Sequence, residues 1–347
     1  MRILFDILHP AHAHFFRHIY DRMKSRHDIQ FVIRNKDVTR NLMDSFGLPY
    51  SQASDAASSS LNLMTELIQR SLYIDKIVRK SKIDILAGIS GISLAFSSFL
   101  RSRPLFVFTD TEDTGLQSRL VFPIANRIVT PNCFARDFGK KHIRYKGYQE
   151  LAYLHPNYFK PDASVLHEVG LSEDQDYVFL RFTSFGASHD ISQHGLNLEE
   201  KTKLVDYLSS KYNVMISSEG EIPKRFEKFR YKGAPRNIHH FLHYARLFFG
   251  DSQTMTTEAG ILGTPAIRCN SLAGSIHGIG NFTELERTYG LVYSFRNFGK
   301  AFQKMNELLA MENLKDIWNV RRSKMLSNMD DVVEFVSNFI ESYHTEN

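Results

Sequence analysis

Cysteine is scarce in this sequence of 347 residues, and its scarcity excludes several classes of protein. The only two cysteines, Cys133 and Cys269, fit no metal-ligand spacing. Such sparse use of cysteine is typical of a reducing compartment. We therefore expect neither a disulfide-stapled secreted domain nor a cysteine-based zinc site.

Long hydrophobic runs are also missing. The longest uncharged run lies between Asp84 and Arg101, and it is shorter than the roughly 20 residues needed to span a bilayer. The first ten residues carry Asp6 and Pro10 and are too short for a signal-peptide core. We therefore expect a cytoplasmic protein with at most a peripheral contact at the inner face of the membrane.

A strong excess of one charge is absent as well. The chain has 43 Lys and Arg against 38 Asp and Glu, a dispersed net charge of +5. Two basic stretches with aromatic residues, GKKHIRYKGY and KRFEKFRYKG, are more often solvated surfaces than nucleic-acid sites. We expect no nucleic-acid partner, whereas a basic patch that faces an anionic membrane or acceptor fits the charge equally well.

The chain is long enough for two domains, and its pattern repeats accordingly. Apolar runs that read as strands alternate with helical periodicity over the first 150 residues, and the pattern restarts after the aromatic connection 146–162. We therefore expect an α/β protein with two Rossmann-like domains whose parallel sheets face each other across a cleft. We expect domains over 1–155 and 156–325, and a final helical segment, 326–347, that packs back on the first domain.

The stretch 247–270 is the most informative part of the chain. Leu247–Phe249 reads as a buried strand, a polar turn follows, and a helix then runs to the stop signals Gly263 and Pro265. The start of a helix favours phosphate, because its N–H groups are unpaired. The residues that can present such groups are Ser252, Gln253, Thr254 and Met255. Glu258, one turn further along the helix, can accept hydrogen bonds from ribose hydroxyls. An ordinary capped turn fits this pattern equally well.

Two further loops after strands of the first half carry candidate catalytic groups. His9, His12 and His14 follow the first strand, and they could bind a metal, act as a base or be structural. Asp110 and Glu112 follow the strand at 104–109. This acidic loop could hold a cation, orient a histidine, bind an acceptor or be a solvated turn.

The second half offers more candidate ligands of a diphosphate. Arg181 can give a bidentate contact, or it can pair with a carboxylate at the interface between the domains. The turn that follows can present backbone groups through Ser184, Gly186, Ala187 and Ser188, and Glu219 follows the next strand.

Six motifs in order resemble a prokaryotic domain-of-unknown-function family regarded as GT-B-type glycosyltransferases. The motifs are FDILHPAHAHFFRH, FTDTED, GYQELAYLHP, LRFTSFGASHD, SSEG and GDSQTMTTEAGILGTPAIRCNS. More distantly, the chain is similar to the lipid II-forming N-acetylglucosaminyltransferase and to the non-hydrolysing UDP-N-acetylglucosamine 2-epimerases.

This distant similarity extends to particular positions. Ser184, Gly186 and Ala187 match the transferase's diphosphate loop, with Thr183 in place of its glycine. Ser252–Thr254 replaces the epimerase's Ser-Gly-Gly turn. Glu258 matches the acidic residue that holds the nucleotide sugar.

The resemblance implies a transferase that takes a nucleotide sugar, most simply a UDP-sugar, in its C-terminal domain. The N-terminal domain would bind a glycan, a lipid-linked acceptor or another cell-envelope polysaccharide precursor. His14 or His12 would take the acceptor's proton, with Asp110 or Glu112 orienting that histidine or replacing it as the base. The scheme needs neither a metal nor a cofactor. The alternatives are a 2-epimerase and a non-catalytic binder of nucleotides or polyanions.

Overall fold

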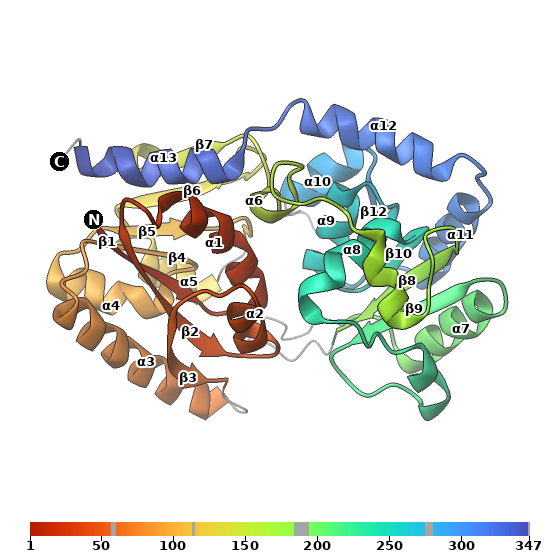
Figure 1. The fold of residues 1–347 in the computed structure, drawn as a ribbon, viewed down its shortest axis with the longest axis horizontal. Helices are drawn as coiled ribbons and strands as arrows, with labels where there is room; N and C mark the ends of the chain where they lie inside the picture. Colours follow the sequence, from red (N-terminus) through yellow and green to blue (C-terminus); the bar gives the residue numbers. More distant parts are fainter. Residues whose placement is uncertain (57–59, 113–114, 184–193, 275–279, 346–347) are drawn as a thin grey trace. The chain divides into compact units, whose positions relative to one another are not determined.

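The computed structural model of the chain describes residues 1–56, 60–112, 115–183, 194–274 and 280–345. These residues form two compact units, whose helices and strands are labelled in Figure 1. Unit 1 comprises Met1–Tyr158 and Met329–Asn347, and unit 2 comprises Phe159–Asn328. The chain therefore enters unit 1 twice.

Unit 1 is built on a 7-stranded sheet with the order β3-β2-β1-β4-β5-β6-β7, and all its strand pairs are parallel. The strands are β1 (Arg2–Ile7), β2 (Asp28–Asn35), β3 (Tyr50–Asp55), β4 (Ile85–Ile89), β5 (Leu105–Phe108), β6 (Arg127–Pro131) and β7 (His142–Tyr145). The helices are α1 (Pro10–Met23), α2 (Thr39–Ser45), α3 (Ser60–Lys80), α4 (Ile92–Arg101), α5 (Gly115–Val121), α6 (Leu151–Leu154) and α13 (Val332–Thr345).

Helices cover both faces of this sheet, because alternate strand residues point to opposite sides. On one face, Leu4 and Val107 join a core with residues of α3, α4 and α5. On the other face, Phe5 stacks on Phe16 of α1 at 4.4 Å, and Phe106 lies 5.1 Å from Phe339 of α13. The last helix of the chain thus completes the hydrophobic core of unit 1.

Unit 2 repeats this architecture with a 5-stranded parallel sheet of order β12-β11-β10-β8-β9. The strands are β8 (Tyr177–Phe182), β9 (Asn213–Ser218), β10 (Leu247–Gly250), β11 (Ala266–Cys269) and β12 (Val292–Phe295). The helices are α7 (Leu198–Ser209), α8 (Ile238–Tyr244), α9 (Gln253–Leu262), α10 (Gly280–Arg287), α11 (Phe298–Leu309) and α12 (Leu314–Leu326). The predicted α/β class, two Rossmann-like domains with parallel sheets, is confirmed.

Two glycines of unit 2 meet specific backbone requirements. Gly250 ends β10 so close to β8 that a Cβ atom there would lie 2.7 Å from the carbonyl oxygen of Arg181. Gly263 ends α9 with φ +84°, the left-handed conformation that favours glycine. The predicted stop of this helix at Gly263 is therefore confirmed.

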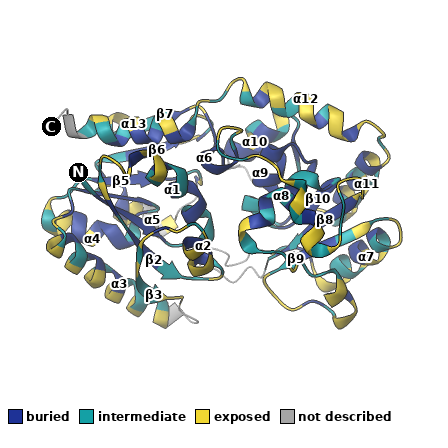
Figure 2. Ribbon diagram, viewed as in Figure 1, coloured by how far each residue is buried: buried dark blue, intermediate teal, exposed yellow. Residues whose placement is uncertain are grey.

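The sequence predictions missed two strands and two short α-helices, none of which has a long apolar run. β3 (YSQASD) and β7 (HIRY) are the outer strands of the sheet in unit 1, and most of their residues are only partly buried. The helices are α6, which lies in the stretch read as a connection between domains, and α10. Figure 2 shows how the dark blue, buried residues concentrate on the inner strands of each sheet.

No helix in the described ranges is long and apolar enough to cross a membrane.

A buried charge cluster ties the centre of the sheet in unit 1 to its helices. Asp6 on β1 accepts hydrogen bonds from the guanidinium of Arg70 on α3 and from the hydroxyl of Ser93 on α4. Arg70 also donates to the carbonyl oxygen of Ile33 at 2.8 Å, and both charged side chains are almost completely buried. Removing one partner would leave the other charge buried without compensation.

We therefore expect Arg70→Met to lower the free energy of unfolding by about 3–5 kcal/mol. The matched control is Arg22→Met, which breaks a solvent-exposed ion pair with Glu334 in the same unit and should cost at most about 1 kcal/mol. Urea titration of both variants measures the difference. Equal losses in the two variants would contradict a structural role for the buried pair.

Candidate functional site

In unit 1, the predicted histidines lie where β1 ends and α1 begins. His9 caps the helix, with its Nδ1 accepting the N–H of Ala11 at 3.2 Å. His12 is half-buried, and its Nδ1 accepts the N–H of Leu8 at 3.3 Å. Burial lowers the pKa of His12 well below its ordinary value, and the charges of His9 and Arg70 lower it further. A ring that is neutral at neutral pH can accept a proton.

His14 has a different environment from His12. It is 7% exposed, and its ring centroid lies 5.2 Å from that of Phe46 and 5.1 Å from that of Tyr153. These contacts make His14 part of the packing of α1 against α2 and α6. Of the two candidate bases, His12 is therefore the more accessible.

The two candidate acids follow β5, which is separated from β1 in the sheet by β4. Asp110 is half-buried, whereas Glu112 is buried and its Oε1 accepts the N–H of Ala135 at 3.2 Å. The Glu112 carboxylate thus connects the loop after β5 to the loop after β6. Within the described ranges, no group of three His, Cys, Asp or Glu side chains is placed to hold a metal ion.

Sequence reasoning missed two further polar groups of unit 1, Tyr145 and Glu150. Burial raises the pKa of Tyr145 well above its ordinary value, and the negative charges of Asp110 and Glu150 raise it further. Glu150 belongs to the GYQE motif, which the sequence analysis assigned to a connection between domains. The relevant signal was a polar pair, Gln149 and Glu150, in the segment that follows β7.

In unit 2, the predicted strand, polar turn and helix occur as β10, Asp251–Ser252 and α9. Ser252 has an extended backbone and caps α9, with its Oγ accepting the N–H of Met255 at 3.3 Å. The candidate residues at this helix start, Ser252, Gln253, Thr254 and Met255, are all half-buried. A helix start with this exposure can accept an anion.

Glu258 lies one turn into α9 and is only 5% exposed. Its Oε1 lies 3.0 Å from Nε2 of His239 on α8. The sequence analysis did not connect these two residues, because 19 positions separate them along the chain. His239 is therefore one of the contacts of the Glu258 carboxylate.

Arg181 and Glu219, which were both predicted to bind a nucleotide sugar, form an ion pair with each other. Arg181 also donates to the hydroxyl of Ser217 at 2.7 Å. The carboxylate that pairs with Arg181 thus belongs to the same unit and directly follows the neighbouring strand β9, whereas the sequence analysis had considered a carboxylate at the interface between the domains. The other predicted ligands of the diphosphate, Ser184, Gly186, Ala187 and Ser188, lie outside the described residues.

Asp251 holds together the strand ends around this region, although it was not among the predicted site residues. Its Oδ1 accepts the N–H of Thr183 at 2.7 Å and the hydroxyl of the same residue at 3.0 Å. Its other oxygen accepts the N–H of Leu196, and its backbone carbonyl accepts the amide of Asn270 at 2.8 Å. Burial raises the pKa of Asp251, while the hydrogen bonds from Thr183 act in the opposite direction.

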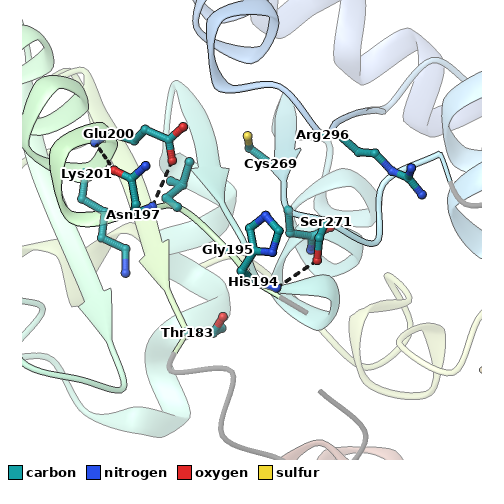
Figure 3. Close-up of a pocket in the computed structure, with 11 residues that line it drawn as sticks. Thr183, His194, Gly195, Asn197, Glu200, Lys201, Cys269, Ser271 and Arg296 are labelled. Atoms are coloured by element: carbon teal, nitrogen blue, oxygen red, sulfur yellow. Dashed lines mark hydrogen bonds between the residues drawn. The ribbon is translucent and has the colours of Figure 1, made fainter. Parts of the chain in front are cut away.

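A cavity of about 480 Å³ lies beside these strand ends, between the start of α7 and the end of β11. Figure 3 shows Asn197, Glu200 and Lys201 of the α7 start on one side of this cavity and Arg296 on the other. The N–H of His194 donates to the hydroxyl of Ser271 at 2.9 Å and joins the two sides. The remaining lining residues are Thr183, Gly195, Leu196, Cys269 and Asn270.

A family model described as "Protein of unknown function (DUF354)" matches residues 1–335. The chain belongs to this family. Across 281 residues it is 20% identical to an uncharacterized protein of Methanocaldococcus jannaschii. This match covers 76% of this chain and 80% of that protein. The family resemblance inferred from the six motifs is thereby confirmed.

Solved structures show the same fold. A UDP-GlcNAc 2-epimerase from Neisseria meningitidis bound to UDP-GlcNAc is 10% identical with a TM-score of 0.71, and all of both chains is covered. SsfS6, a glycosyltransferase from Streptomyces sp. SF2575, is 9% identical with a TM-score of 0.56, covering 97% of the DUF354 chain and 99% of SsfS6. The DUF354 chain thus has the two-domain fold of GT-B glycosyltransferases and UDP-GlcNAc 2-epimerases.

The environment of His12 leads to a pH-dependent prediction. We expect its imidazole to titrate below the ordinary histidine pKa of about 6.5, because burial and nearby positive charge disfavour the charged form. Between the lowered pKa of the folded state and the ordinary pKa of the unfolded state, the unfolded chain binds more protons than the folded chain. His12 therefore lowers the stability as the pH falls below about 6.5. NMR titration of the ring, assigned by comparison with His12→Asn, measures the midpoint.

Urea titrations of the wild type and of His12→Asn at neutral and mildly acidic pH provide a second measurement. The variant should lose less stability on acidification than the wild type. A titration midpoint at or above the ordinary histidine value would contradict the described environment of His12.

Proposed function

We propose that this DUF354 protein is a glycosyltransferase that moves a sugar from a nucleotide sugar to an acceptor hydroxyl. The observation that carries the proposal is the Ser252-capped start of α9 at the carboxyl end of β10. β8 and β10 are neighbours in the sheet. The strand that follows β8 in sequence, β9, lies on one side of this pair, and the strand that follows β10, β11, lies on the other side. Ligands of open α/β sheets bind at such a switch point.

The donor in this proposal is a nucleoside diphosphate sugar. Its diphosphate would bind the N–H groups at the start of α9, and the Glu258 carboxylate one turn on would accept hydrogen bonds from the ribose. Arg181 would contact the diphosphate on release from Glu219, together with the turn Ser184–Ser188. A uridine donor is favoured because the epimerase of the same fold was solved with UDP-GlcNAc.

The acceptor hydroxyl belongs, in this scheme, to a glycan, a lipid-linked sugar or another cell-envelope precursor bound by unit 1. Its oxygen attacks the anomeric carbon, the bond from that carbon to the diphosphate breaks, and the diphosphate leaves with the electron pair. His12 takes the hydroxyl proton, and His14 is the second choice because it is more buried. Asp110, or less directly Glu112, would orient the base or act in its place.

A UDP-sugar 2-epimerase is the second candidate. It is favoured by the TM-score of 0.71 to the Neisseria meningitidis enzyme over the complete chain. An epimerase needs no acceptor, whereas a transferase produces nothing beyond slow hydrolysis without one. The two functions are therefore separable by experiment.

The donor site is tested with Glu258→Gln, which keeps the size of the side chain but removes its charge. We expect binding of a UDP-sugar to weaken about tenfold or more, roughly 1.4 kcal/mol, in isothermal titration calorimetry. Glu227→Gln, at an exposed carboxylate of the same unit, is the matched control and should bind like the wild type. Unchanged binding in Glu258→Gln would overturn the role of Glu258.

The base is tested with His12→Asn. We expect the Kd of the donor to stay within about twofold, while turnover falls by about 10²–10⁴, the usual contribution of a general base. His167→Asn, at an exposed histidine of unit 2, serves as the control. Wild-type turnover in His12→Asn would exclude His12 as the base, and the same measurement on His14→Asn would then test the second choice.

The reaction class is tested by proton NMR of the protein with UDP-GlcNAc and no acceptor. The transferase proposal predicts that the sugar keeps its configuration at C2. Appearance of the 2-epimer would overturn that proposal in favour of the epimerase. Saturable binding without transfer to any extract-derived acceptor would instead favour a non-catalytic binder.

A further inference from the structure

The outer face of three neighbouring helices in unit 1 exposes large apolar side chains. On α3 they recur every fourth residue, so they form one stripe along the helix. On α4, three more occupy the side of the helix opposite the buried Leu94. These side chains are between 44% and 77% exposed, and we call them the apolar face: Met64, Ile68, Leu72, Phe96, Phe99, Leu100 and, on α5, Leu120.

The residues of this face lie side by side because α3 and α4 are packed against each other. Near the ends of both helices, Arg101 donates to the carboxylate of Asp75 at 2.9 and 2.8 Å. Further back, Arg70 and Ser93 bind the same aspartate, Asp6. In Figure 2, yellow exposed residues follow α3 and α4 along their outer sides.

The hydrophobic core of unit 1 does not require these exposed side chains to be apolar. The inner sides of α3 and α4 already supply the core through Ile74, Val78 and Leu94, which are buried. A surface helix normally carries polar residues on its other side. A contiguous exposed apolar surface instead marks a site of interaction with another apolar phase or molecule.

The edge of the apolar face is positively charged. The α3 stripe continues from Leu72 to Lys76 and then to the last turn of the helix, and further cations follow α3 and α4 or lie on α5. These cations are Lys76, Arg79, Lys80, Lys82, Arg103 and Arg119. The two carboxylates of α3, Glu66 and Asp75, already bind Arg34 and Arg101, and the sequence of α4 contains no acidic residue.

We propose that this face docks unit 1 onto an anionic lipid surface, with the apolar side chains in the headgroup region and the cations on lipid phosphates. Surface-bound proteins combine these two features, because apolar burial and attraction to anionic lipids add. Phe96 and Phe99 are suited to this position, because helices that lie on a membrane surface carry Trp, Phe and Leu on the side that enters the headgroup region.

A second copy of the chain fits this face less well than a membrane does. In a two-fold symmetric dimer the same patch meets itself, so the cations of both copies would be gathered at one interface. Like charges placed opposite each other oppose association. An anionic bilayer instead offers apolar depth and the opposite charge together.

This inference does not depend on the proposed sugar transfer, because docking is measured without any substrate. If both proposals hold, the acceptor would be a lipid-linked sugar presented at the same bilayer. Loss of docking with intact transfer, or the reverse, would separate the two proposals.

The test uses the full chain with vesicles of phosphatidylcholine alone or mixed with phosphatidylglycerol, in a flotation assay. We expect the wild type to float with the mixed vesicles at about 0.05 M salt and to be largely released at about 0.5 M salt. Phe96→Ser/Phe99→Ser and, separately, Lys76→Gln/Arg79→Gln/Lys80→Gln should each lower partitioning about tenfold or more.

Matched controls change equivalent exposed residues of unit 2. Leu198→Ser/Val320→Ser removes two exposed apolar side chains. Lys224→Gln/Lys228→Gln/Lys232→Gln removes three exposed charges from the basic stretch KRFEKFRYKG. Both controls should partition like the wild type. If a variant of the apolar face melts at a lower temperature than the wild type, Leu72→Ser/Leu120→Ser replaces it.

Three outcomes would overturn the proposal. The first is a wild type that stays with neither kind of vesicle. The second is wild-type partitioning of both the apolar and the cationic variants. The third is a wild-type dimer, measured by light scattering, that becomes monomeric in Phe96→Ser/Phe99→Ser, because a second copy would then occupy the face.

Discussion

Parallel strand pairing is the constraint on which both units depend. All strands of a parallel sheet end at the same edge, so the chain must return over a face of the sheet after each strand, and helices make these returns. Both faces are then covered, and the inner strands become apolar runs such as LFVF and LFFG. Polar residues that follow these strands have only one edge to occupy. Polar groups distant in sequence, such as Thr183 and Asp251, meet there for this reason.

Each sheet has an aspartate at the point where its strand order reverses. In unit 1, Asp6 of β1 accepts the hydroxyl of Ser93, which follows β4, the neighbour of β1 on the other side of the reversal. In unit 2, Asp251 after β10 accepts the hydroxyl of Thr183 after β8. Burying a carboxylate is costly unless hydrogen bonds or a counter-charge compensate. Arg70 supplies the counter-charge in unit 1, whereas backbone N–H groups compensate in unit 2.

The elements that the sequence predicted well are those whose local signal agrees with their environment. The stretch 247–270 contains β10 and α9 where the sequence predicted a strand and a helix, and α9 has the Ser252 cap and the Gly263 stop. β3 and β7 were missed because outer strands need only partial burial and therefore carry no apolar run. The sequence also placed His12 and His14 together after the first strand, but it could not tell which ring packs against aromatic neighbours. That distinction comes from Phe46 and Tyr153, which lie on other elements.

By itself, the sequence determined the α/β class, the two repeats of the strand-helix pattern, and which loops carry polar groups. These properties follow from local periodicity and turn chemistry, which act over a few residues. Only the tertiary structure decided that Glu258 meets His239, that Arg181 meets Glu219, and that Asp251 joins three loops. Such pairings depend on strand order and helix packing, because these bring together residues that are distant along the chain.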